Sequence, residues 1–184
     1  MKKKLGCSCL VVAVATGILS LSVFASDGTV NFTGEVVNNT CAVTNGGAGK
    51  TTQVNLDKIN ASSLADVGNT GGFKPFTISV TGCNKELAGL VKVGFESVGA
   101  GVEAAVGRIK NTNAGGAKNV ELQLRNLDNT VIKIGDNSTV NGVTFAAGTA
   151  PKSADMTYYV GYYATGAATP GQVNGSVTYS IIYP

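Results

Sequence analysis

Cysteine is the residue type in this chain best suited to chemistry, because histidine is absent. Two of the four cysteines, Cys7 and Cys9, lie close to the first residue, which leaves Cys41 and Cys83 as a pair. This pair could form a structural disulfide or supply a reactive thiol. A thiol nucleophile needs a neighbouring base to ionise it, and histidine is the usual one. The sequence therefore favours a disulfide between Cys41 and Cys83.

The other patterns with chemical potential are weak. Without histidine there is no Ser-His-Asp triad and no imidazole metal site. The glycines at 99–101 lack the third glycine and the strand–turn–helix setting of a dinucleotide fingerprint. The 11 acidic residues are scattered, as on a solvated surface; the alternative is a pair of carboxylates brought together by folding, as in a glycosidase. We expect no enzymatic activity, no cofactor and no metal.

Tyrosines 158, 159, 162 and 163 are the one aromatic cluster, and tryptophan is absent. An exposed aromatic cluster could serve as a platform for sugars. The run also alternates as a strand does, which would send successive tyrosines to the core and to the surface. We favour the second interpretation.

The first 25 residues have the layout of a secretory signal peptide. Lysines at 2–4 precede an apolar run at 5–23, and Ala25 ends a plausible cleavage site. The alternative is an uncleaved anchor, since the run approaches the roughly 20 residues that span a bilayer. Threonine, serine and glycine dilute the run, so we expect cleavage. Residues 26–184 then form a single exported domain without direct membrane insertion.

Charge changes with cleavage. Removing the three lysines lowers Lys+Arg from 14 to 11, which equals the 11 Asp+Glu. A nucleic acid or an anionic membrane surface attracts proteins with a positive field. We therefore expect neither as a partner of the mature chain.

The mature sequence is typical of short β-strands separated by turns. Val30, Phe32 and Val36 alternate with polar residues, which is the period of a strand with one apolar face. Further strands are predicted at 76–80, 90–95, 120–124, 131–134 and 156–163, and a last one with Val177, Tyr179, Ile181 and Tyr183 on its apolar face. Clusters of asparagine and glycine mark the turns. Many short strands with little helix predict an all-β antiparallel sandwich.

One short helix or turn is predicted at 60–67, where Asn60 or Ser62 could cap it. The two terminal strands leave two interpretations open, because such strands lie at sheet edges unless something pairs with them. Both could complete the chain's own sandwich. Alternatively, the first could join the sheet of another subunit.

Residues 28–37, followed by Thr40 and Cys41, resemble the N-terminus of type 1 and F17-like fimbrial major subunits, which are chaperone–usher pilins. Cys83 falls where that family places its second disulfide cysteine. Gly171 and Tyr183 match its glycine before the final strand and its penultimate tyrosine. The similarity covers residues 26–184. Pro184 departs from the family, which more often ends in a polar residue.

The resemblance implies an incomplete immunoglobulin-like β-sandwich that a donor strand from a neighbouring subunit completes. It implies that 26–33 is the donor strand and 34–184 the sandwich. Val30 and Phe32 would enter the groove of the neighbour, and Gly28 would lie where that groove admits only a small residue. The groove and the chaperone-binding surface would be formed by the C-terminal strand with Gly171, Val177, Tyr179, Ile181, Tyr183 and Pro184.

The resemblance also implies a function and partners. The chain would be a structural major subunit of a fimbria that supports cell adhesion, exported through the periplasm to the cell surface. Its partners would be identical subunits, a periplasmic pilus chaperone, the outer-membrane usher and tip or minor subunits. Two alternatives remain: a minor, adaptor or terminator subunit, and a self-contained secreted carbohydrate-binding module.

Overall fold

The computed structural model describes residues 31, 33, 41–44, 51–98, 101–148 and 152–184. The chain divides into two units, Met1–Val36 and Val37–Pro184. In the first unit only Asn31 and Thr33 are described, and both are exposed. The predicted cleavage site and the strand predicted around Val30 therefore lie outside the described residues. Among the described residues, no helix has the length and apolar character needed to cross a membrane.

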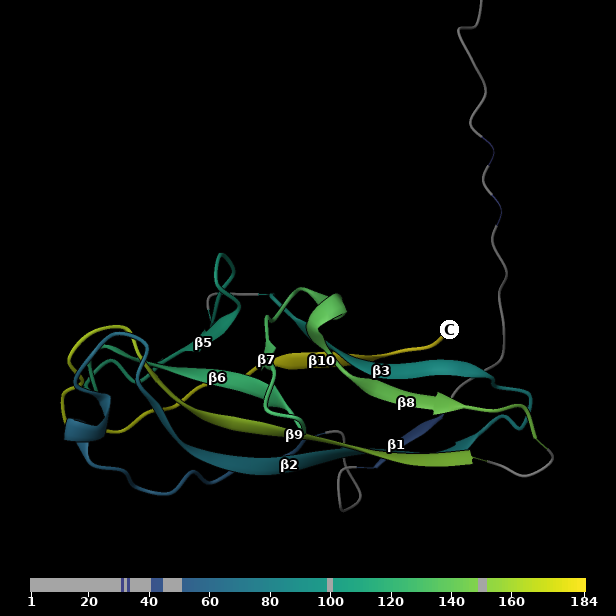
Figure 1. Ribbon diagram of the computed structural model, residues 1–184, viewed down its shortest axis with the longest axis horizontal. Coiled ribbons are helices and arrows are strands. Elements are labelled where there is room, and N and C mark those ends of the chain that lie inside the picture. Colours follow the sequence, from purple (N-terminus) through teal and green to yellow (C-terminus); the bar gives the residue numbers. More distant parts are fainter. Residues whose placement is uncertain (1–30, 32, 34–40, 45–50, 99–100, 149–151) are drawn as a thin grey trace, which may run out of the picture. The chain divides into compact units, whose positions relative to one another are not determined.

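The described part of the second unit contains short and long β-strands with two 3-10 helices (Figure 1). The strands are β1 (Ala42–Thr44), β2 (Thr70–Cys83), β3 (Gly89–Glu96), β4 (Val102–Glu103), β5 (Arg108–Lys110), β6 (Val120–Asn126), β7 (Val131–Ile132), β8 (Gly142–Phe145), β9 (Lys152–Ala164) and β10 (Thr178–Ile182). The helices are η1 (Ala61–Leu64) and η2 (Asn137–Thr139).

The strands form two antiparallel sheets. The larger has the order β1-β2-β9-β6-β5-β4, with β7 paired to β6. The smaller has the order β10-β3-β8. The long pair β2 and β9 forms the centre of the larger sheet, and β10 stands at the edge of the smaller one.

The core lies between the two sheets and is built from the alternating apolar residues of their strands. Ile78 and Val80 of β2 and Val91 and Val93 of β3 belong to one cluster, and all four are almost fully buried. This is the period-two pattern from which the strands were predicted. The predicted all-β antiparallel arrangement is thus the arrangement observed.

Three aromatic rings join the two sheets. Tyr158 of β9 packs edge-on against Phe95 of β3, with ring centroids 5.2 Å apart, and lies 5.9 Å from Phe76 of β2. The Tyr158 hydroxyl donates a hydrogen bond to the Asn141 carbonyl (2.9 Å), and burial raises the pKa of the phenol to about 12. Tyr158 is only 2% exposed and is a core residue, as the alternation predicted.

The short helix η1 lies where the sequence predicts a helix or turn. Asn60 is its N-cap, and the Asn60 side-chain oxygen accepts a hydrogen bond from the Ser62 backbone N–H (3.3 Å). Capping of this kind satisfies a backbone donor that the first turn leaves without an intrahelical partner.

Candidate functional site

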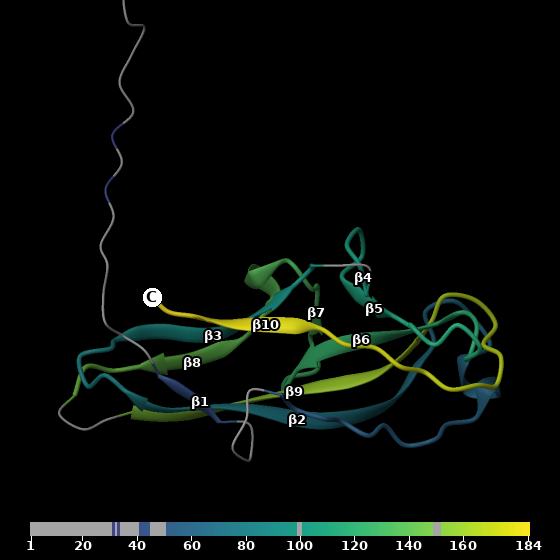
Figure 2. The ribbon, with the colours of Figure 1, turned by 180° about the vertical axis from the view of Figure 1, so that it is seen from behind.

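A groove of about 640 Å³ runs along β10. Figure 2 shows β10 beside β3, and residues 51–56, which precede η1, also contribute to the lining of the groove. The side chains that line the groove come from both sheets and are mostly apolar: Val43, Val54, Leu56, Phe76, Ile78, Phe95, Ile109, Leu122, Leu124, Val160, Val177, Tyr179, Ile181 and Tyr183. The core of the sandwich is thus open to the outside along this line.

The apolar face of the last strand forms one wall of this groove. Val177, Tyr179, Ile181 and Tyr183 pack against the core but remain only partly buried. Thr178 and Ser180, which lie between them, are exposed. Apolar side chains that contact a core on one side and solvent on the other indicate a surface that another chain covers.

The backbone of β10 is also open on one side. From Thr178 to Ile182 the strand pairs with β3. Among the described residues, no strand pairs along its other edge. Such an edge presents backbone N–H and C=O groups to an incoming strand. The groove therefore offers both a hydrogen-bonding edge and an apolar floor.

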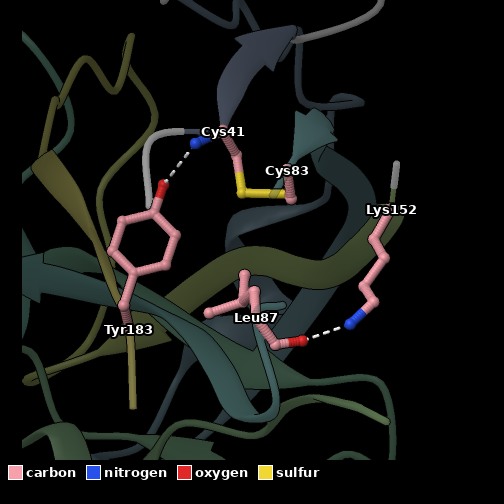
Figure 3. The surroundings of a disulfide bond; sticks show 5 residues. All are labelled: Cys41, Cys83, Leu87, Lys152 and Tyr183. Atoms are coloured by element: carbon pink, nitrogen blue, oxygen red, sulfur yellow. Dashed lines mark hydrogen bonds between the residues drawn. A yellow bond between two sulfur atoms is a disulfide. The ribbon is translucent and has the colours of Figure 1, made fainter. Parts of the chain in front are cut away.

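A disulfide and a hydrogen bond join the start of β1 to the end of β2 and to the C-terminal segment (Figure 3). The disulfide joins Cys41 to Cys83, as predicted. The Cys41 backbone N–H donates a hydrogen bond to the Tyr183 hydroxyl (3.2 Å) across 142 residues of sequence. Nearby, the Lys152 ammonium donates to the Leu87 carbonyl. These contacts fix the end of the last strand against the start of β1.

Gly171 does not line the groove, although the sequence analysis grouped it with the residues that do. It lies in the segment before β10 and packs against the backbone at 116–117. A Cβ atom at Gly171 would be 2.3 Å from the Ala117 nitrogen and 2.6 Å from the Gly116 carbonyl carbon. This backbone approach leaves no room for a side chain at Gly171.

Pro184 also lies outside the groove lining. A Cβ atom at Gly89 would be 2.8 Å from the Pro184 Cβ, so the proline ring rests on the start of β3. The predicted donor residues Gly28, Val30 and Phe32 lie outside the described residues. In the described part of the chain, no three His, Cys, Asp or Glu side chains are grouped to hold a metal ion.

Gly171→Ala is expected to lower the free energy of unfolding by roughly 3 kcal/mol, at the upper end of the cost of overpacking. The methyl group would push apart two backbones that are joined by the hydrogen bond from the Ala117 N–H to the Gln172 carbonyl (3.0 Å). Urea denaturation measures the change. Gly148→Ala is the control, because a Cβ there meets nothing closer than 4.0 Å. Equal urea midpoints for Gly171→Ala and Gly148→Ala would show that the backbone at Gly171 can accommodate a methyl group.

Sequence reasoning did not single out the wall formed by residues 51–56. Thr52, Val54 and Leu56 alternate with polar residues and line the groove. That alternation was the signal in the sequence from which this part of the groove lining could have been predicted. The segment belongs to no strand in the structure.

Comparison with known proteins identifies the family. The model of the family "Type-1 fimbrial protein, A" (FimA) matches residues 56–184, which include β10 and most of the groove floor. The chain belongs to the type-1 fimbrial protein family. The resemblance seen in the sequence is thereby confirmed.

This fimbrial subunit is similar to other fimbrial proteins along nearly its whole length. It is 41% identical over 168 residues to the major fimbrial subunit SMF-1 of Stenotrophomonas maltophilia (strain K279a), covering 89% of this chain and 96% of that protein. It is 36% identical over 178 residues to the F17 fimbrial protein of Escherichia coli, covering 94% and 96%. A chain from a solved chaperone–usher pilus has a similar fold, with a TM-score of 0.55 at 16% identity, covering 86% of this chain and 96% of that one.

The family fixes the broad function. The protein is a structural major subunit of a cell-surface fimbria, and it is not an enzyme. The fold is the predicted incomplete immunoglobulin-like sandwich, as in the pilus structure. Subunits of such a fimbria assemble into a polymer.

Proposed function

We propose that subunits polymerise by donor-strand exchange, in which residues 26–33 of one copy fill the groove of the next. The observation that carries the proposal is the open edge of β10 above a half-exposed apolar face. A single β-segment would cover that face and pair with that edge. Residues 1–25 would be removed as a signal peptide, and residues 34–184 would form the sandwich that accepts the strand.

The donor segment has the pattern that the groove requires. Val30 and Phe32 alternate with polar residues, at the same period as Val177 and Tyr179 on the groove wall. Burial of each donor side chain would contribute roughly 1.5–3 kcal/mol. Main-chain hydrogen bonds to β10 would add about 1 kcal/mol each. Gly28 would lie where the groove admits only a small residue.

The same groove supports the proposed partners. An open strand edge beside exposed apolar side chains favours non-specific association. A periplasmic chaperone that lends a strand to the groove would prevent this before assembly, and the outer-membrane usher would be the place of exchange. Tip or minor subunits would join the fibre through the same groove.

Deletion of residues 26–32 tests the donor assignment. The shortened chain keeps the groove and loses the strand, so we expect it to copurify with a pilus chaperone in a one-to-one complex and to be missing from fibres. Size-exclusion chromatography measures the complex, and electron microscopy with immunolabelling measures incorporation. Fibres built from the shortened chain alone would show that another segment is the donor.

A further inference from the structure

The side chain of Asn111 makes every hydrogen bond that an amide group can make. Its Nδ2 donates to the Ala117 carbonyl (2.9 Å) and to the Gln172 carbonyl (3.0 Å). Its Oδ1 accepts from the backbone N–H groups of Asn113 (3.1 Å) and Asn174 (3.0 Å). An amide group has two donor hydrogens and an oxygen with two acceptor sites. The bonds to Gln172 and Asn174 cross 61 and 63 residues of sequence, so they join two distant segments.

All four partners of Asn111 are main-chain groups, so the amide fixes the path of the backbone. Two backbone hydrogen bonds join the same segments. The Thr112 N–H donates to the Asn174 carbonyl (2.8 Å), and the Ala117 N–H donates to the Gln172 carbonyl (3.0 Å). Residues 172–174 are therefore held against the loop that follows β5 through both N–H and C=O groups.

The held segment leads directly into the groove. Gly175, Ser176 and Val177 follow it and contribute to the groove lining, and β10 begins at the next residue. Gly175 lies close against the larger sheet, because a Cβ atom there would be 2.6 Å from the Ile109 Cγ2. The path of the main chain at 172–174 therefore decides how these three residues line the groove where β10 starts.

We infer that Asn111 is a positioning residue of the acceptor groove, which holds residues 175–177 in place before a strand enters. The inference rests on the proposed function, and the strand is residues 26–33 of a second copy of this chain. A binding surface that is ordered in advance loses less conformational entropy when its partner binds. Without the Asn111 amide, the main chain before β10 would lose two of the bonds that hold it. The entering strand would then have to order this segment.

The test is Asn111→Ala, which removes all four side-chain bonds and adds no charge. A fluorescently labelled peptide of residues 26–36 is bound to the full exported chain, and its release is timed after dilution under conditions in which the chain is folded. We expect release roughly tenfold faster from the variant, which corresponds to the cost of ordering the backbone of about one residue. In the empty chain, the backbone N–H of Asn174 should exchange its hydrogen faster in the variant than in the wild type.

Thr112→Val is a milder second variant that keeps the test open if Asn111→Ala does not fold. It removes the hydrogen bond from the Thr112 hydroxyl to the Asn174 carbonyl (3.1 Å) and leaves the backbone bond in place. Thr112 is exposed, so valine meets no packing constraint there. We expect release about twofold faster, since a single hydrogen bond of this kind contributes little net stability.

Asn119→Ala is the matched control. The Asn119 Nδ2 donates to the Ala167 carbonyl (2.9 Å), earlier in the segment that precedes β10, and neither residue lines the groove. The φ of Asn119 is +58°, which asparagine adopts more readily than alanine. Asn119→Ala should therefore unfold at lower urea concentration than the wild type and release the peptide at the wild-type rate.

The outcomes separate positioning from stability. A purely structural role for Asn111 predicts that Asn111→Ala and Asn119→Ala behave alike, with lower stability and unchanged release, and that result would overturn the inference. Faster release with unchanged hydrogen exchange at Asn174 would overturn it as well, because the segment would not have loosened. Failure of the peptide to bind the wild-type chain would instead count against the proposed function, while exchange at Asn174 would still show whether Asn111 holds the segment.

Discussion

Replacement of both Cys41 and Cys83 by alanine is expected to lower the free energy of unfolding by about 4 kcal/mol. The disulfide closes a loop with a sequence separation of 42 residues. In the chain-entropy model, opening a loop of this length returns that much conformational freedom to the unfolded chain. Cys83 is only 1% exposed, and alanine avoids the burial of a new polar group there. Urea denaturation of the oxidised wild type and of the double variant measures the difference.

Two comparisons separate the bond from the side chains. The reduced wild type keeps both sulfur atoms and lacks only the bond, so it should unfold near the midpoint of the double variant. The second comparison is between the denaturant slopes of the oxidised wild type and the double variant, because the slope scales with the surface exposed on unfolding. A loss below about 1 kcal/mol would show that the unfolded chain is already compact around this loop, since residual structure reduces the entropy that the bond removes.

Phe32→Asp is expected to abolish fibre formation if residues 26–33 are the donor strand. The variant would place a carboxylate against the apolar floor that includes Phe76, Ile78 and Leu124. An unpaired charge in such surroundings costs several kcal/mol, which exceeds the roughly 1.5–3 kcal/mol that a buried phenylalanine contributes. The amount of polymer that resists guanidinium measures the outcome.

Thr33→Asp is the control for this experiment. It introduces the same charge one residue away, on the face that the alternation directs to solvent, and Thr33 is exposed in the single subunit. Its polymer should match the wild type. If Phe32→Asp and Thr33→Asp both gave wild-type yields of polymer, the side chain of Phe32 would not enter the groove. Loss of polymer from both would point to an effect of charge on export or on usher passage.

Alternation along the sequence predicted the long strands because each of them buries one face. Ile78 and Val80 lie in β2, and Met156 and Tyr158 lie in β9, each on the core side of its sheet. The short strand β4 gave no such signal. β4 has only two residues, Val102 and Glu103, which is too few to show a period. Its pairing with β5 depends on tertiary contacts.

The predicted strand at 131–134 is shorter in the structure. Val131 and Ile132 pair with β6, and the chain then turns at Gly135, where φ is +90°. Ile134 is buried although it lies outside the strand, so its apolar character reflects packing in the core and not pairing in the sheet. The groove wall opposite β10 was missed for a related reason. Residues 51–56 alternate but pair with no strand, and only the folded sandwich shows what they face.

The order of the strands along the chain has a consequence for synthesis. β10 forms a wall of the groove, yet it follows every other described strand in the sequence, and Tyr183 must return across 142 residues to meet Cys41. If the groove along β10 is the acceptor, as proposed, a nascent or truncated polypeptide without these residues has no acceptor site, however well its earlier strands fold. The proposal therefore predicts that a subunit can accept the next one only when translation has passed β10, so incomplete products could not be extended.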